Sequence, residues 1–154
     1  RPVFGQSLCF FPTGFGKGQL LAVDPNGKND ITQTNIKWRL TRSGVPEKPS
    51  LLLVDAHLYL IDDQGGLVTC LEAKTGKEAW SERLGGNYSA SPITTQGRIY
   101  AFSESGKCTV FKASAKGFQK LAQNNLESGF MASPAVHGNA LILRTKTHLY
   151  RVED

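Results

Sequence analysis

The sequence contains few cysteines, and those it has are far apart. Its 154 residues include only Cys9, Cys70 and Cys108. Three scattered cysteines are too few for a disulfide framework or a zinc site, both of which need paired or closely spaced sulfur atoms. We therefore expect each one to lie inside a strand as a small buried hydrophobic side chain.

Long apolar runs and targeting signals are also absent. No stretch of about 18 apolar residues occurs, so no insertion into a membrane is expected. Nothing in the sequence resembles a signal peptide. The chain begins at Arg1 and not at a methionine, which is typical of a processed chain or an excised piece.

Positive charge predominates, but it is dispersed. The formal net charge is +5, and no run of lysines and arginines accounts for it. The aromatic residues fall inside the apolar segments and do not alternate with cations along one stripe. This distribution indicates a soluble surface and no nucleic-acid partner.

Helical periodicity is missing as well. Apolar residues come in short runs bounded by Gly, Pro, Asn and Asp, and no long window shows an apolar face at a spacing of about 3.6 residues. The 16 glycines fit a protein rich in turns. The sequence therefore predicts an all-β fold.

The stretch from Pro49 to Pro92 predicts four short strands joined by three turns. The expected strands cover residues 51–54, 57–61 and 67–71, with a fourth beginning at residue 78. Four strands in about forty residues are typical of one blade of a β-propeller. We expect run 51–54, like run 141–143, to be covered on both sides by neighbouring blades.

The same pattern recurs along the whole chain. Two kinds of marker repeat, a proline at the start of each copy and a glycine before the third strand. The markers are Pro2, Pro49, Pro92 and Pro134, spaced by 47, 43 and 42 residues, and Gly18, Gly66 and Gly106, with Thr147 in the last copy. We expect each proline to begin a strand, where no ladder donor is needed.

The repeats predict one propeller fragment of about four blades, each of four antiparallel strands. The predicted blades are 1–47, 48–90, 91–132 and 133–154, the last one incomplete. The first copy is longest because its last turn, residues 24–35, is enlarged. Such an insertion is tolerated in a surface loop.

With these motifs in place, the sequence resembles the pyrroloquinoline-quinone-type (PQQ-like) propeller repeat, which is also WD40-like in its blade layout. The second copy carries most of the pattern, with Gly66, Thr75-Gly76-Lys77 and Trp80. The first copy keeps Trp38, and the third keeps Ser91-Pro92 but places Leu121 where the tryptophan would fall. The resemblance implies that Trp38 and Trp80 dock between neighbouring blades, each donating its indole N–H to a backbone carbonyl.

This family implies a ring of seven or eight blades, so about four blades would make half of one. An open half-ring exposes apolar blade faces, which soluble monomers rarely tolerate. Two arrangements would cover them: further blades of a longer protein, or a second copy in a head-to-tail homodimer.

The resemblance leaves one enzymatic alternative, a fragment of a quinone-dependent dehydrogenase. Such enzymes carry an adjacent cysteine pair, a calcium site and a catalytic aspartate, and this sequence has no adjacent cysteines. Asp62-Asp63 and residues 24–30 are interpreted as turns, where aspartate bonds to nearby backbone. His57, His137 and His148 fall at strand ends and turns without a nucleophile motif. The sequence predicts no catalytic, cofactor-binding or metal-binding residue.

The favoured hypothesis is a non-enzymatic module for protein–protein interaction or ligand sensing, with a protein or peptide partner. The resemblance implies either a scaffold of outer-membrane barrel assembly or a sensor region attached to a Ser/Thr kinase. It also implies a periplasmic or other extracytoplasmic location. The residues expected to hold the blades are Pro49, Pro92, Pro134, Gly66, Gly106, Trp38 and Trp80.

Overall fold

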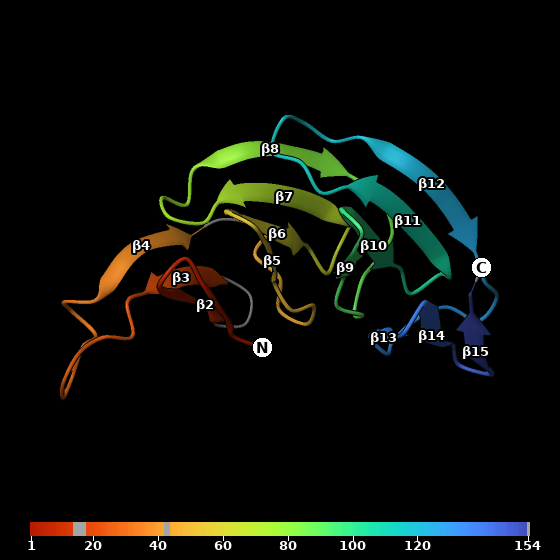
Figure 1. Ribbon diagram of the computed structural model, residues 1–154, viewed down its shortest axis with the longest axis horizontal. Helices are drawn as coiled ribbons and strands as arrows, with labels where there is room; N and C mark the ends of the chain where they lie inside the picture. Colours follow the sequence, from red (N-terminus) through yellow and green to blue (C-terminus); the bar gives the residue numbers. More distant parts are fainter. Residues whose placement is uncertain (14–17, 42–43, 154) are drawn as a thin grey trace.

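The computed structural model describes residues 1–13, 18–41 and 44–153, and these residues form strands and no helix. Consequently, no helix in the described part of the chain could span a membrane. The strands form separate antiparallel sheets, here called blades 1 to 4, in which each strand pairs with its neighbours in the sequence. Figure 1 shows the blades following one another along an arch.

The strand bounds follow the repeats. Blade 1 contains β1 (Val3–Gly5), β2 (Leu8–Thr13), β3 (Gln19–Val23) and β4 (Ile36–Thr41); blade 2 contains β5 (Leu52–Val54), β6 (His57–Ile61), β7 (Leu67–Glu72) and β8 (Glu78–Arg83). Blade 3 contains β9 (Ile93–Thr95), β10 (Arg98–Phe102), β11 (Lys107–Lys112) and β12 (Lys120–Asn125); blade 4 contains β13 (Ala135–His137), β14 (Ala140–Arg144) and β15 (Leu149–Val152). The short first strands β5, β9 and β13 lie on the concave side of the arch and β4, β8 and β12 on its convex side (Figure 1). The predicted all-β propeller fold is confirmed.

The pairing register corrects the proline marker. The hairpins align through the pairs Val54 with His57 and Thr95 with Arg98. In that alignment Pro92 directly precedes β9, and the matching position before β5 is Leu51. Pro49 therefore lies two residues too early to belong to the series, and the prolines precede the first strands instead of beginning them.

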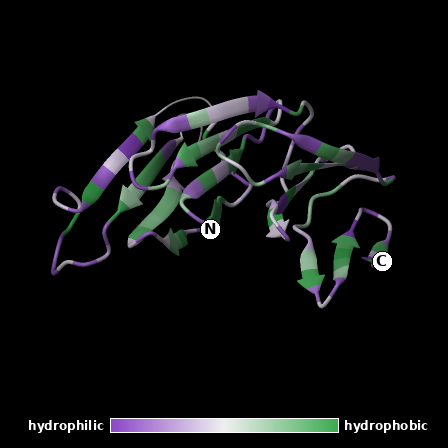
Figure 2. Cartoon of the chain, turned by 45° about the horizontal axis from the view of Figure 1, so that its top comes forward, coloured by the Kyte–Doolittle hydropathy of each residue, from purple (hydrophilic) through white to green (hydrophobic). Residues whose placement is uncertain are grey.

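Three apolar cores fill the seams, which are the interfaces between neighbouring blades. Figure 2 shows the apolar residues concentrated in the inner strands, whereas loops and outermost strands are largely hydrophilic. The prediction that run 51–54 is covered on both sides was wrong, because β5 is only half-buried. The continuous buried run belongs to β6 and β7, each of which has one face in each of two seams.

Both tryptophans close seams as predicted. The Trp38 Nε1–H donates to the Ala73 carbonyl at 2.9 Å, and the Trp80 Nε1–H donates to the Ser114 carbonyl at 2.8 Å. Each acceptor lies in the next blade. The same hydrogen bond, from an indole N–H to a backbone carbonyl of the next blade, therefore occurs in both seams.

The third seam has no tryptophan, and the position that replaces it is Ala122, not Leu121. Trp38 pairs with Ala22 and Trp80 with Cys70, and the matching pair in blade 3 is Ala122 with Val110. All three pairings are followed by a β-bulge. Leu121 is the extra residue of that bulge, which sequence spacing alone does not reveal.

A serine hydroxyl at the start of blade 3 and another at the start of blade 4 link each of these blades to the blade before. The Ser50 N–H donates to Ser91 Oγ and the Ser91 N–H donates to Ser133 Oγ, both at 2.9 Å. These bonds satisfy backbone donors that the short first strands leave unpaired. Ser91 and Ser133 are therefore seam residues, a role that the sequence pattern did not reveal.

The cysteines lie in strands as predicted, but only Cys70 is fully buried. Cys9 and Cys108 are half-buried, and all three are free thiols. Burial raises the pKa of the Cys108 thiol to about 11 and also raises that of Cys70. Raised values disfavour the thiolate, the reactive form.

Candidate functional site

The turns between the second and third strands of each blade lie at the same end of the sheets as the connections between blades. This placement follows from the antiparallel order of strands. One turn position can be compared in three blades through the strand register: it holds Asp63, Glu104 and Lys146. The same position in the fold therefore carries a carboxylate in two blades and an amine in the third.

In blade 2 the position is structural. Asp63 is buried, and its carboxylate accepts the Glu47 N–H at 2.6 Å and the Lys48 N–H at 2.9 Å. These charge-assisted bonds fix the connection from blade 1. Asp63 is therefore occupied and does not face a partner.

In blade 3 the position is partly exposed. Ser89 Oγ–H donates to Glu104 Oε1 at 2.5 Å, and Lys48 Nζ lies 3.5 Å from the same oxygen. The hydrogen bond from Ser89, together with the charge of Lys48, holds the pKa of Glu104 below its usual range. Glu104 is therefore ionised, and its charge is largely balanced by its neighbours.

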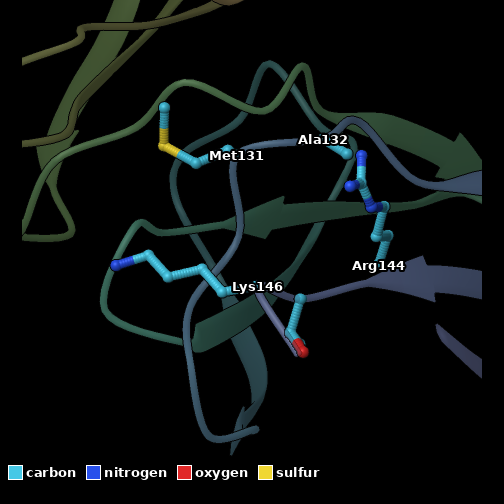
Figure 3. A pocket seen from close by; sticks show the side chains of 5 residues that line it. Met131, Ala132, Arg144 and Lys146 are labelled. Atoms are coloured by element: carbon cyan, nitrogen blue, oxygen red, sulfur yellow. The ribbon is translucent and has the colours of Figure 1, made fainter. Parts of the chain in front are cut away.

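In blade 4 the position carries an exposed cation. Lys146, Arg144 and Met131 line a shallow cavity of about 280 Å³. Figure 3 shows the side chains of Met131 and Lys146 extending to the same side, while that of Arg144 extends towards Ala132. Met131 is 56% exposed.

We call these residues together the basic rim. It consists of Lys48, Ser89, Glu104, Met131, Arg144 and Lys146. The charge of Lys146 makes a small contribution to the lowered pKa of Glu104, after those of Ser89 and Lys48. Three cations against one anion leave the rim positive, with an exposed thioether beside the charges. Such a surface suits carboxylates and apolar side chains of a protein partner.

The residues weighed from the sequence as alternatives lie elsewhere and serve turns. The Asp24 carboxylate accepts the Asn26 N–H at 3.0 Å and pairs with Lys37. Asp30 accepts the Thr32 N–H at 2.9 Å. Within the described residues, no group of three or more His, Cys, Asp or Glu side chains is arranged to hold a metal ion.

The basic rim was not predicted, although the sequence contains a signal for it. Lys48, Ser89 and Met131 each lie two residues before the seam serine of their blade connection. An alignment of the repeats on these serines would have shown that the residue two positions earlier varies, whereas the serine itself repeats. The misplaced Pro49 marker concealed the alignment.

Solved structures with the same fold include natural and designed propellers. BamB from Moraxella catarrhalis gives a TM-score of 0.68 at 15% identity, over 94% of this chain and 39% of that one. The computationally designed Ika8 protein gives 0.71 at 14% identity, over 97% and 43%. A europium-containing methanol dehydrogenase gives 0.61 at 15% identity, over 80% and 24%. At such identities the likeness shows the fold alone, and the chain spans less than half the length of each.

Sequence comparison identifies the family more directly. No curated protein matches the chain significantly. A family model described as outer membrane protein assembly factor BamB matches residues 16–145, which is most of the sequence. The chain therefore belongs to the PQQ-type propeller repeat family of the outer membrane protein assembly factor BamB.

Proposed function

We propose that the chain is a non-enzymatic interaction module that binds a protein partner through the basic rim. The observation that carries the proposal is the exposed Met131 flanked by Arg144 and Lys146. Arginine and methionine are enriched at protein interfaces, and methionine adapts its shape to a partner.

The family supports a scaffold role. Its model is described as an outer membrane protein assembly factor, and assembly factors act by holding other proteins. On the same ground, we propose a location outside the cytoplasm. A sensor role, in which the rim binds a ligand and changes the affinity of an attached domain, is a variant of the same surface function.

The alternative is a piece of a quinone-dependent dehydrogenase. The likeness to a methanol dehydrogenase supports it at the level of fold, but the adjacent cysteine pair of such enzymes has no counterpart in this sequence. Titration with the quinone and calcium distinguishes the two hypotheses. A stoichiometric complex with a visible absorbance band would favour the enzyme.

Site-specific crosslinking tests the interaction. A photo-crosslinking amino acid at Met131 should capture one defined partner, whereas the same group at the exposed Lys74 should not. Lys74 lies in the β7–β8 turn, at the opposite end of the sheets. Replacing both Arg144 and Lys146 by glutamate should abolish the adduct. Equal labelling from both positions, or an adduct that survives the double substitution, would contradict the proposal.

The head-to-tail homodimer remains a prediction. Pairing would bring the open face of blade 4, with Arg144 and Arg151, against the open face of blade 1, where Arg39 lies beside Leu21. Like charges oppose this contact, and salt screens them. The dimer should therefore strengthen with salt, and light scattering should show twice the mass of 16.8 kDa. A monomer at both low and high salt would exclude it.

A further inference from the structure

The enlarged turn between β3 and β4, residues 24–35, contains the only Asn-Gly pair in the sequence, Asn26-Gly27. Both residues are exposed, and Figure 1 shows the turn extending away from blade 1 at one end of the arch. An asparagine followed by glycine can lose its side-chain amide without an enzyme. The next backbone nitrogen attacks the side-chain carbonyl, and glycine leaves that approach open because it has no Cβ.

Packing inside the turn requires this glycine. Gly27 does not have a positive φ, so its backbone conformation alone does not demand glycine. An added Cβ would, however, clash with Ile31 Cγ2 and would lie 3.0 Å from Asn35 Nδ2. The turn therefore excludes larger residues at position 27, and the reactive pair is a consequence of the way the turn folds.

The atoms that would react are not engaged in hydrogen bonds. Within the part of the chain that the structure describes, the Gly27 N–H donates no hydrogen bond and Asn26 Oδ1 accepts none. The Asn26 side chain is held only through its amide nitrogen, which donates to Asp24 Oδ1 at 3.0 Å. Both the attacking nitrogen and the carbonyl that it attacks are therefore accessible.

The repeats show that this turn position is exposed even where a preceding blade is present. The cross-strand pairs of Trp38 and Trp80 align Asn26 with Lys74 in blade 2. Lys74 and Thr75 are exposed, although blade 1 packs against blade 2 through a shared apolar core. The same place in blade 1 is therefore on the surface whatever adjoins that blade.

We propose that Asn26 is a site of spontaneous deamidation. The Gly27 nitrogen forms a bond to Asn26 Cγ, the bond from Cγ to Nδ2 breaks, and the amide leaves as ammonia with the proton of the Gly27 N–H. Solvent water then opens the resulting succinimide ring at either of its carbonyls, which gives aspartate or isoaspartate at position 26. The sequence of steps needs no oxidant, reductant or cofactor.

Either product would remove bonds that hold the turn closed. The Asp24 carboxylate accepts both the Asn26 N–H and its Nδ2–H at 3.0 Å, and a second carboxylate in place of the amide would repel it. Asn35 Nδ2 donates to the Asn26 carbonyl at 2.7 Å and to the Asp24 carbonyl at 2.9 Å. In isoaspartate the Asn26 carbonyl leaves the main chain, so the first of these bonds loses its geometry. Deamidation should therefore open the turn.

The test incubates the whole chain in mildly alkaline buffer and follows its tryptic peptides by mass spectrometry. Trypsin yields peptide 18–28, in which Asn26 is the only asparagine, and peptide 29–37, whose two asparagines are a control from the same turn. Peptide 18–28 should gain aspartate and isoaspartate at least about tenfold faster than peptide 29–37 is deamidated. Equal rates in the two peptides, or a peptide 18–28 that stays intact, would overturn the proposal.

Two variants test the effect on the turn. Asn26→Asp has the aspartate product in place, so it should raise the pKa of Asp24, which the hydrogen bond from the Asn26 N–H now lowers. It should also shift the amide NMR signals of residues 24–35. Asn29→Asp is the matched control, because it adds the same charge to the same turn at an exposed residue that makes no hydrogen bond to Asp24, and it should change that pKa less. An equal Asp24 pKa in the two variants would refute the predicted opening.

Discussion

Removal of one indole N–H tests whether the tryptophans hold the blades together. Trp80→Phe keeps an aromatic ring in the seam but deletes the 2.8 Å hydrogen bond to the Ser114 carbonyl. The lost bond costs about 1 kcal/mol net, and the carbonyl left without its donor adds to that cost. The smaller ring also loses contact with Tyr59, Phe111 and Phe118, worth about another 1 kcal/mol.

The expected loss for Trp80→Phe is therefore ~2 kcal/mol in the free energy of unfolding. With a urea dependence of about 2 kcal/mol per molar, the midpoint should fall by about 1 M at an unchanged slope. Trp38→Phe is the matched variant, because it deletes the equivalent bond to Ala73, and it should lose a similar amount.

Urea titration followed by far-ultraviolet circular dichroism measures both variants without relying on tryptophan fluorescence. A midpoint within about 0.2 M of the wild type for both would mean that the seams are held by apolar burial alone. The view of the tryptophans as seam residues would then be wrong.

Three further predictions concern the turns and connections. Asp63→Asn should destabilise the fold by about 1–3 kcal/mol in urea titration, because a neutral amide replaces the carboxylate that accepts two backbone N–H groups; an unchanged midpoint would contradict this role. Because the pKa of Glu104 is lowered from the usual 4.5, its contribution to stability is present above about pH 4.5 and is lost as the pH falls through the lowered value. Glu104→Gln should therefore reduce the difference between the free energies of unfolding at pH 7 and at pH 3. The same difference in the variant as in the wild type would exclude the effect. Gly66→Ala should lower the stability more than Gly97→Ala does: both glycines have positive φ, but only at Gly66 would an added Cβ clash with the Tyr88 ring. Equal midpoints for the two alanine variants would refute the steric argument.

The fold could be predicted from the sequence because its evidence is periodic. Gly66 and Gly106 mark the same turn, and Trp38 and Trp80 mark the same seam. Each repeat had to bury two faces, so short apolar runs between turn residues were sufficient to indicate stacked sheets. Local chemistry and global architecture agree at these positions.

The details that failed are those that depend on register. Pro49 has the composition of a blade marker but lies two residues off, and Leu121 fills the expected spacing but belongs to a bulge. A shift of one residue in a strand moves a side chain to the opposite face. Repeat spacing in the sequence locates a residue only to within one or two positions. A shift of one position already decides whether a side chain faces the seam or the solvent.

The basic rim was not predicted because it arises where one copy departs from the others. The Asp63 carboxylate accepts backbone N–H groups, and the partly exposed Glu104 accepts a hydrogen bond from Ser89. Lys146 is exposed. The tryptophan position also changes, from an indole in two seams to Ala122 in the third. Each seam is made by its own pair of neighbouring copies, so one copy can lose a structural residue while the other blades stay folded, and its position becomes part of the surface. In this chain the tryptophan position changes at the seam between blades 3 and 4, and the turn position becomes a cation in blade 4.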